Sequence, residues 1–397
     1  MLRRTFLKGL TVTTVVVVGG RVFRALGDEI SSPFEGPAFG PWKDWQRPGG
    51  GPLGLVRAAI LGASAVNTQP WMFKVTDSWI DLYADNRRNC GAFDPYLREL
   101  HISVGCALEN LMLAAAAEGY NASATLVPGQ LGPAAAGAQP TKAARVELTA
   151  GVPERSALYE AIPHRHTNRA PFDSLTPLPH TFVKALKSIY GGPSLSLFVF
   201  TQDEQRKRIA EAVAGASGKL MADPQVLQDE MRWVRTDARA AQESRDGVAA
   251  EGIGASSGDA ALRANGACPE LLSTARLWGL IAVRDRYSRE QSVQAGRVWQ
   301  RAHLLATSCG VAGRPANQAV ELIDQERVRG GEPAQADALA ALTGDASWQP
   351  TFMFYMGYSA REAPPSVRRP VEEFVIYSLP RDPRPAAGDS GPRLTWI

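Results

Sequence analysis

Segments with helical periodicity alternate with short strand-like segments over most of the 397 residues. In residues 98–120, apolar side chains recur every three or four positions, which predicts a helix with one face in the core. Trp71–Val75 and Trp79–Tyr83 instead alternate in polarity around a turn, which is typical of a β-hairpin. Further strands are expected at 195–200, 278–283 and 351–358, and further helices at 53–61, 203–220 and 289–309. Because helices and strands interleave, we predict an α+β fold with mixed sheets flanked by helices.

The length of the chain is compatible with two lobes. It suffices for two or three domains, or for one large domain, with a sizeable core. We expect a signal segment at 1–30, an extended connector at 31–52, a first lobe at 53–150 and a second lobe at 151–397. The low-complexity segment 128–141 is taken as the boundary region. Residues 222–262 are charged, rich in Ala and Gly and weakly patterned, so we expect them to form a lid on the second lobe.

The N-terminus resembles a twin-arginine export signal. Arg3 and Arg4 precede Phe6-Leu7-Lys8 and an uncharged apolar run from Leu10 to Val18. This run is shorter than the roughly 20 residues that span a bilayer, so we expect no stable membrane span. An ordinary secretory leader or a short anchor is the alternative. Ala25-Leu26-Gly27 is a weak cleavage site, which leaves cleavage open. The signal predicts a periplasmic protein that the twin-arginine translocation machinery exports already folded.

Charge and cysteine content point to no further partner. With 43 basic and 40 acidic residues the formal net charge is +3, which does not indicate a nucleic-acid partner. The four cysteines are far apart and form no cluster with histidines at zinc spacing, so we expect no metal site. We expect them to be small buried side chains, although two that lie close in space can become oxidised in an exported protein.

A first polar turn is expected where the helix near residue 61 gives way to the hairpin. Its sequence is Ala63-Ser64-Ala65-Val66-Asn67-Thr68-Gln69-Pro70-Trp71. A hydroxyl, amides and free backbone N–H groups at such a turn can bind the edge of a polar ligand, while Pro70 and Trp71 fix the start of the strand. A plain structured turn is the alternative reading of these residues.

A second segment, His164 to Phe172, contains Arg165, Thr167 and Arg169 at alternate positions. In an extended strand these three side chains project to the same side, where two guanidinium groups and a hydroxyl suit a phosphate. A solvated basic loop is the alternative. A third segment, Arg368-Arg369-Pro370, lies between the last two predicted strands, 351–358 and 371–377, and would add a further cation to the same anion.

Together these segments resemble the nitroreductase family of FMN enzymes, and in particular its Acg-like branch. In that family a Ser-x-x-Asn-x-Gln-Pro-Trp segment precedes a hairpin, and an Arg-x-Ser/Thr-x-Arg/Lys segment precedes a Phe. The resemblance covers most of residues 53–377 and includes further short matches. These are Leu82-Tyr83-Ala84-Asp85, Asp94-Pro95, Arg98-Glu99, Ile102-Ser103 with Gly105, Gly310 to Gln318, and Met356-Gly357-Tyr358.

The order of the two motifs departs from the ordinary family. An ordinary nitroreductase subunit carries the arginine motif first and the Asn-x-Gln-Pro-Trp motif shortly after it, and two subunits hold each flavin together. Here Asn67 comes first, and the motif around Arg165 is not followed by a second Asn-x-Gln-Pro-Trp. We infer a nitroreductase-like fold duplicated in one chain as a fused pseudo-dimer, with one FMN between the lobes. Such a chain is compatible with a monomer.

The resemblance implies a role for each motif residue. Arg165 and Thr167 would contact the FMN phosphate, with Arg368 or Arg369, and Arg169 would approach the pyrimidine end of the flavin. Ser64, Asn67 and Gln69 would hold the ribityl chain and the ring edge from the other lobe. Pro315, Asn317 and Gln318 would pass backbone amides along the flavin's reactive nitrogen. Family members have an acidic residue and a glycine near positions 317 and 318, so the chain departs from the family there.

The resemblance implies a nitroreductase-type oxidoreductase that passes two electrons, as hydride, from a small-molecule donor through FMN to a quinone or nitroaromatic acceptor. Solvent can supply the protons, so no catalytic acid or base is assigned. A flavin-sequestering protein, with residues 222–262 covering the flavin, is the main alternative. A serine hydrolase is a remote one: Gly254-Ala255-Ser256-Ser257-Gly258 matches a nucleophile elbow, with Asp285 and His303 following, but no buried strand is expected before it.

Overall fold

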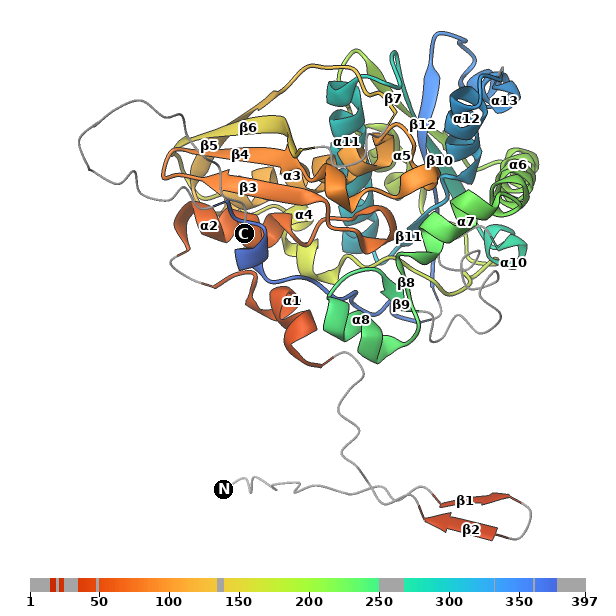
Figure 1. Ribbon diagram of the computed structural model, residues 1–397, viewed down its shortest axis with the longest axis horizontal. Coiled ribbons are helices and arrows are strands. Elements are labelled where there is room, and N and C mark those ends of the chain that lie inside the picture. Colours follow the sequence, from red (N-terminus) through yellow and green to blue (C-terminus); the bar gives the residue numbers. More distant parts are fainter. Residues whose placement is uncertain are drawn as a thin grey trace, which may run out of the picture.

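The computed structural model describes residues 15–18, 21–24, 35–47, 50–133, 139–249, 268–331, 333–359 and 361–376 (Figure 1). Near the N-terminus, β1 (Val15–Val18) and β2 (Arg21–Arg24) pair antiparallel with each other. Most other strands described belong to two four-stranded sheets, and β8 (Val234–Arg235) and β9 (Val248–Ala249) form a short parallel pair. Helices pack against both sheets, so the predicted α+β class is confirmed.

The first sheet is built by the first half of the chain. It comprises β3 (Trp71–Val75), β4 (Trp79–Ala84), β5 (Tyr120–Leu126) and β6 (Thr141–Ala150), in the order β3–β4–β6–β5, with antiparallel neighbours. The predicted hairpin is present, because the backbone N–H of Thr76 donates to the carbonyl of Trp79 at 3.0 Å. The sheet packs against α2 (Gly51–Ala59) and α3 (Arg98–Ala117).

The second sheet is covered on both faces. It comprises β7 (Leu195–Phe200), β10 (Leu277–Val283), β11 (Ala312–Pro315) and β12 (Gln349–Gly357), in the order β11–β12–β10–β7. Every residue of β10 is buried, as expected for a central strand between two helical layers. Trp278 and Leu280 pack with α6 (Asp203–Met221) and α12 (Gln318–Val328), whereas Leu277 and Ile281 pack with α11 (Arg289–Ser308).

The two sheets have the same topology. In both, the strands numbered along the chain lie in the order first, second, fourth, third, and every neighbouring pair is antiparallel. In both, one 20-residue helix, α3 or α11, connects the second strand to the third. The halves differ between their first two strands: residues 76–78 suffice in the first half, whereas residues 201–276 intervene in the second.

The long helices α3 and α11 cross at two glycines. Gly105 and Gly296 are each the eighth residue of their helix. A Cβ on Gly105 would lie 2.0 Å from the carbonyl oxygen of Val293, and a Cβ on Gly296 would lie 1.9 Å from that of Ile102. The contact is therefore reciprocal. Helix α3 has the length and hydropathy of a membrane span, but 89% of its most apolar window is buried, as in the core helix of a globular protein.

The last described residues return to the first sheet. The backbone N–H of Phe73 donates to the carbonyl of Phe374 at 2.8 Å, and Ile376 donates to the carbonyl of Phe73 at 2.7 Å. This bridge is parallel, so the first sheet is mixed, as predicted. Near the other end of the chain, α1 (Gly40–Asp44) is held by the indole N–H of Trp42, which donates to the carbonyl of Ser366 at 2.7 Å.

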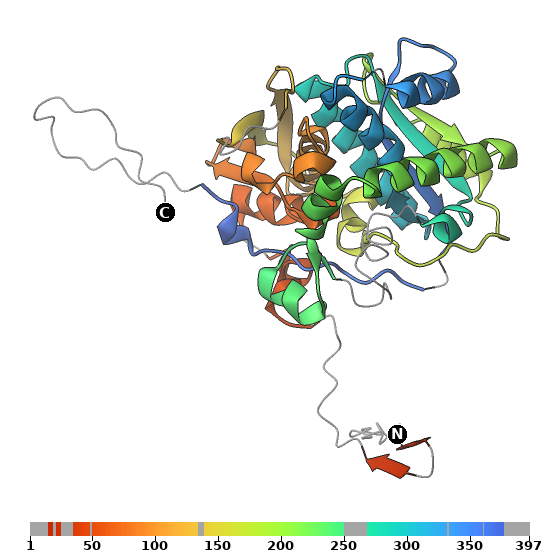
Figure 2. The same ribbon diagram turned by 45° about the vertical axis from the view of Figure 1, so that its right-hand side comes forward.

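Two segments differ from what their sequences suggested. Residues 128–141 connect β5 to β6 within one sheet, so this low-complexity stretch is not a boundary between lobes. Residues 222–249 form regular secondary structure, although their sequence is weakly patterned: α7 (Pro224–Met231) and α8 (Ala238–Ser244) alternate with β8 and β9. In Figure 2 these green elements extend from the second sheet toward α1. The rest of the predicted lid, with the motif around Ser256, lies outside the described residues.

Candidate functional site

A cavity of about 870 Å³ opens among segments that are far apart in the sequence. Its wall is formed by the turn after α2, by α3, by the segment that follows His164, by α8 and β9, by β11 with the start of α12, and by the segment before Arg369. Both halves of the chain therefore contribute to one cavity. Its volume lies in the range of roughly 300–1,000 Å³ that is usual for small-molecule and cofactor sites.

Nine of the eleven residues expected to bind a cofactor line this cavity. They are Ser64, Asn67, Arg165, Thr167, Arg169, Pro315, Asn317, Gln318 and Arg368. Arg165, Thr167 and Arg169 of the second motif all reach the cavity as expected, and Asn168 between them lines it as well. This segment runs beside β11, where the backbone N–H of Asn168 donates to the carbonyl of Gly313 at 3.2 Å.

The turn after α2 has an unusual backbone. Val66 and Asn67 have φ angles of 37° and 59°, and Gln69 has a φ of 51°. A positive φ is costly for a β-branched residue such as Val66, and it persists only where the surroundings enforce it. One such contact comes from Ser64, whose hydroxyl accepts from the backbone N–H of Gln69 at 3.2 Å. The turn is thus a rigid corner of the cavity.

The side chain of Asn67 bonds to two other segments of the wall. Its amide nitrogen donates to the carbonyls of Gly247 and Val367, at 3.0 and 3.1 Å, and its amide oxygen accepts from Arg368 at 2.5 Å. Asn67 thereby joins three segments of the cavity wall. Both hydrogens of its amide nitrogen and its amide oxygen are engaged by protein groups, so the side chain positions the wall.

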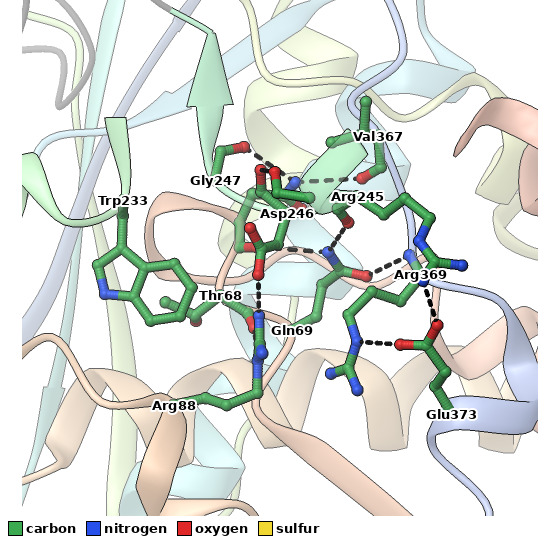
Figure 3. A network of polar contacts seen from close by, with 12 residues as sticks. Thr68, Gln69, Arg88, Trp233, Arg245, Asp246, Gly247, Val367, Arg369 and Glu373 are labelled. Carbon is green, nitrogen blue, oxygen red and sulfur yellow. Dashed lines mark hydrogen bonds and ion pairs between the residues drawn. The ribbon is translucent and has the colours of Figure 1, made fainter. Parts of the chain in front are cut away.

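Gln69 and Arg369 do not line the cavity, contrary to the prediction. Gln69 is fully buried, donates to the carbonyl of Arg245 at 2.8 Å and accepts from the backbone N–H of Arg369 at 3.0 Å (Figure 3). The side chain of Arg369 instead pairs with Glu373 at 2.8 Å and lies over the ring of Phe374. Both residues hold the segment after Ser366 in place. A motif cannot distinguish a ligand-binding amide from one that bonds to backbone.

Arg165 and Arg368 place two positive charges inside the protein. Arg165 is 2% exposed; it contacts Nδ1 of His303 at 3.5 Å and donates to the carbonyl of Leu61 at 3.3 Å. Its Nε has no hydrogen-bond partner among the described residues. Neither arginine has an acidic ion-pair partner in that part of the chain, and burial lowers the pKa of Arg165 to about 10. An anion in the cavity would relieve this excess of positive charge.

Arg368 is held more tightly than Arg165. Its guanidinium donates to the carbonyls of Ile60 and Gly62, each at 3.1 Å, as well as to Asn67, and it lies over the ring of Trp42. We therefore expect Arg368 to hold the wall in shape. Its positive charge still acts on the cavity, without direct contact to a ligand. Arg165 is the arginine with a free donor.

A second pair of arginines lines another part of the wall. Arg169 is solvent-accessible yet enclosed by protein, because it lies inside the cavity. Burial and the charge of Arg314 lower the pKa of Arg169 to about 9. Burial likewise lowers the pKa of Arg314, which is 2% exposed. The repulsion between the two guanidinium groups favours negative charge on a ligand that lies near them.

Two histidines beside this wall are neutral. Burial and the charge of Arg165 hold the pKa of His303 well below its usual value, and the same two causes, with Arg368, lower the pKa of His166 to about 3. His303 also stacks on Trp299, with ring centroids 4.7 Å apart. Neither imidazole is positively charged at neutral pH, so neither adds to the charge of Arg165.

The wall on β11 and α12 matches its prediction in position. Pro315 ends β11, and Asn317 and Gln318 begin α12. The amide oxygen of Asn317 accepts from the backbone N–H of Met353 at 2.8 Å, which fixes the corner between β12 and α12. The side chain of Asn317 thus stabilises this corner.

Several residues of the cavity were missed from the sequence. Arg314 and the apolar residues Phe39, Trp299 and Phe352 lie in elements that were read as connector, helix or strand. Glu99 and Glu321 are buried acidic residues on α3 and α12, and helical periodicity places them on inward faces without indicating that a cavity lies there. Cys106 and Cys268 also line the cavity, and the four cysteines, all described, form no disulfide.

The donor set suits a planar anionic cofactor. Arg165 and Thr167 offer donors to a phosphate, the side chains of Phe39, Ile102 and Phe352 offer apolar surface to a ring system, and Arg169 with Arg314 offers charge to its electron-rich edge. The uncompensated charge and the open Nε of Arg165 are the observations that call for a negatively charged group. FMN has a phosphate, a polar chain and a flat ring system, so the residues present fit it.

Two proteins of Mycobacterium tuberculosis, from strains CDC 1551 and H37Rv, match part of the sequence. Both bear the name of NAD(P)H nitroreductases, and each is 30% identical to the chain over 166 residues. The match covers 40% of this chain and 45% of each relative, so it spans less than half the length of those proteins. The chain is similar to the nitroreductases. No family model matches the sequence.

Solved structures of nitroreductases superpose on part of the chain. A nitroreductase with bound FMN from Desulfitobacterium hafniense gives a TM-score of 0.39 at 14% identity, covering 57% of this chain and 100% of that one. An FMN-dependent nitroreductase from Mycobacterium smegmatis in complex with NADPH gives a TM-score of 0.37 at 20% identity, covering 56% and 98%.

Proposed function

We propose that this protein is an FMN-binding oxidoreductase of the nitroreductase type. The single observation that carries the proposal is Arg165, a buried guanidinium with a free Nε and no acidic partner in the described chain, in the wall of a cofactor-sized cavity. The motif to which Arg165 belongs and the mycobacterial relatives support the same identification. The mycobacterial match covers less than half of those proteins, so the activity itself is inferred for this chain.

We infer that one chain is a fused pseudo-dimer of the Acg-like kind and binds one FMN. The two sheets share one strand order, and α3 and α11 meet through a reciprocal contact at Gly105 and Gly296. Such a reciprocal contact is the rule at a two-fold interface between identical subunits. The cavity lies beside this crossing, because Ile102 and Cys106 of α3 and Trp299 of α11 line it.

Each part of the wall has a role toward FMN. Arg165 and Thr167 would bind the phosphate, and Arg169 with Arg314 would stabilise negative charge at the pyrimidine end, which makes reduction more favourable. Asn67 and Arg368 would keep the wall in shape. When bound, FMN supplies two-electron hydride chemistry. The apolar wall excludes water from the reacting atoms.

The electron donor and acceptor follow from the nitroreductase type. The names of the mycobacterial relatives point to NADH or NADPH as donor, and a quinone or a nitroaromatic compound is the acceptor class that the chemistry favours. Arg3 and Arg4 support export by the twin-arginine machinery to the periplasm. That route carries folded proteins, so the cofactor would be inserted before export.

A flavin-sequestering role is the second candidate. It is favoured by α8 and β9, which line the cavity and are tied to the first half of the chain by contacts from Gly247 to Asn67 and from Arg245 to Gln69. Steady-state oxidation of NADH with a quinone distinguishes the two roles. Sustained turnover supports the reductase, whereas a flavin that stays oxidised under excess NADH supports sequestration.

The flavin itself is tested by the visible spectrum of the purified chain, lacking residues 1–34, after incubation with FMN and gel filtration. We expect a flavin spectrum that survives filtration, and one that is much weaker in Arg165→Ala. The matched control is Arg208→Ala on an exposed part of α6, where the side chain is 73% exposed. A colourless wild-type protein after incubation would contradict the proposal.

A further inference from the structure

Two carboxyl groups face each other in the cavity wall. Glu99 on α3 is 5% exposed and Glu321 on α12 is 2% exposed, and both line the cavity. A hydrogen bond with Glu99 is one cause that raises the pKa of Glu321, and such a bond between two carboxyls requires that one of them carry a proton. The second oxygen of Glu321, Oε2, has no hydrogen-bond partner among the described residues. A buried carboxyl oxygen without a partner is costly in a native protein and calls for an explanation.

The charges around the pair keep this proton in place. Arg98 contacts Glu99 at 3.4 Å, but it also pairs with Asp324 at 2.9 Å, and Arg286 pairs with the same Asp324 at 2.9 Å. Asp94, which precedes α3, and Glu230 on α7 add further carboxyls on other sides. Two guanidinium groups therefore face five carboxyls. Burial and this excess of negative charge raise the pKa of both Glu99 and Glu321.

We propose that Glu321, with its proton shared with Glu99, is the proton donor to the acceptor that is reduced in this cavity. The inference rests on the proposed function and adds to it an acid that the sequence did not reveal. Bound FMN would supply a hydride to an acceptor such as a quinone, and this acceptor would need one further proton on its oxygen to become the hydroquinone. That proton comes from Glu321, and the carboxylate so formed regains a proton from water. Electrons and protons then balance without another reactant.

The first test does not use activity. Infrared spectra of the flavin-free protein at pH 8 should show the carbonyl stretch of a protonated carboxylic acid that is lost in Glu321→Gln. The band should remain in Glu204→Gln, which changes a carboxyl that is 73% exposed on α6, outside the cavity. Identical spectra for wild type and Glu321→Gln would overturn the proposal, because there would be no proton to donate.

The second test separates proton donation from structure. The FMN-loaded protein is reduced and then mixed either with benzoquinone, which needs a proton, or with ferricyanide, which accepts electrons only. We expect Glu321→Gln to slow reoxidation by benzoquinone about 100-fold or more, in the range of general acid catalysis. Reoxidation of Glu321→Gln by ferricyanide should stay unchanged, and Glu204→Gln should behave as wild type with both acceptors. Equal effects of Glu321→Gln on both acceptors, or no effect, would overturn the proposal.

The variant Glu99→Gln keeps the proposed proton donor, Glu321, and removes its neighbour. Removing the neighbouring carboxyl lowers the pKa of Glu321, so the pH at which quinone reduction falls off should move down. An unshifted profile contradicts the shared proton. If the wild type fails to bind FMN, or is reoxidised by neither acceptor, the proposed function fails and this inference falls with it. If both acceptors reoxidise the wild-type protein, and Glu321→Gln and Glu99→Gln react as the wild type does, only this inference fails.

Discussion

Arg165 carries a positive charge that the described protein does not balance. Its hydrogen-bond partners are a neutral imidazole and a backbone carbonyl, and burial lowers its pKa to about 10. The free energy that the protein loses by burying this group is recovered only when an anion enters the cavity. The arginine is therefore a source of instability in the empty protein and of affinity in the complex.

Arg165→Met separates these two effects. We expect the flavin-free variant to be more stable than wild type by about 1 kcal/mol or more, because an uncompensated charge is removed. Its dissociation constant for FMN should rise roughly 10- to 100-fold, the usual size of one charge-assisted hydrogen bond. Urea denaturation measures the stability, and fluorescence titration measures the dissociation constant. Arg208→Met is the surface control, and equal stability together with equal affinity would contradict the assignment.

Asp94 gives a residue-scale prediction about pH. Burial and the neighbouring Glu99 raise its pKa to about 7, above the value of roughly 3.9 of an unfolded aspartate. A raised pKa in the folded state means that stability is highest below pH 4 for this group and is lost as the pH rises toward 7.

In Asp94→Asn this loss should be absent. The amide oxygen can still accept from the backbone N–H of Leu100, which now bonds to the carboxyl at 2.9 Å. The free energy of unfolding of the variant, relative to wild type, should therefore increase between pH 4 and pH 7. Denaturation at these two pH values measures it, and a constant difference would show that the carboxyl is ionised in the fold.

At the residue scale, the sequence predicted the side chains that follow a simple geometric rule. Arg165, Thr167 and Arg169 reach one cavity, as predicted for an extended segment, although Asn168 between them lines it as well. Gln69 and Arg369 belong to the same motifs but bond to backbone and to Glu373, which no spacing reveals. Glu321 was missed because a buried acid on a helix looks like any other polar residue until its neighbours are known.

At the scale of elements, the crossing of α3 and α11 fixes how the two halves meet. Gly105→Ala would place a methyl group 2.0 Å from a backbone carbonyl, so the helices would have to move apart. Overpacking of this kind typically costs about 1–3 kcal/mol, and here backbone lies on both sides. Gly215 of α6 has open space around its missing side chain. Gly215→Ala should therefore be neutral or stabilising by up to about 1 kcal/mol.

Chemical denaturation of the two glycine variants tests the crossing. Gly296→Ala should resemble Gly105→Ala, since the contact is reciprocal. If Gly105→Ala were as stable as Gly215→Ala, the close approach of the helices would be wrong. The helix periods predicted both long helices, but a single sequence cannot show that their glycines meet, because that contact joins residues almost two hundred positions apart.

The segment from α8 to β9 is held by Asp246. Its carboxylate pairs with Arg88 of the first half and with Arg235, and the latter is joined to Ser244 at 3.0 Å (Figure 3 shows Asp246 beside Arg88). We expect Asp246→Ala to speed hydrogen exchange at residues 238–249 and to accelerate FMN release. Glu243→Ala is the matched control, because Glu243 lies on α8 and pairs with the exposed Arg239 of the same helix. Unchanged hydrogen exchange in Asp246→Ala would show that Asp246 does not hold residues 238–249 in place.

At the scale of the whole molecule, the two halves of the chain repeat one sheet topology, as the proposed pseudo-dimer requires. The order of its motifs suggested this arrangement, and the common topology of the sheets now supports it from an independent direction. The excursion between β7 and β10 breaks the symmetry, since the first half has only a tight turn there. That excursion supplies α8 and β9 to the cavity, so the two halves are arranged for one site rather than two.

The most direct test of the central claim is a titration of the flavin-free protein with FMN, followed by absorbance and by the mass of the complex under native conditions. We expect saturation at one FMN per chain in a single step. The affinity for FMN should be lower in Arg165→Met, and also in Asn67→Ala, which alters the opposite wall. Saturation should also raise the unfolding free energy, by about 2.7 kcal/mol at 100 times the dissociation constant. No binding, two FMN per chain, or indifference to either substitution would contradict a single flavin site built from both halves.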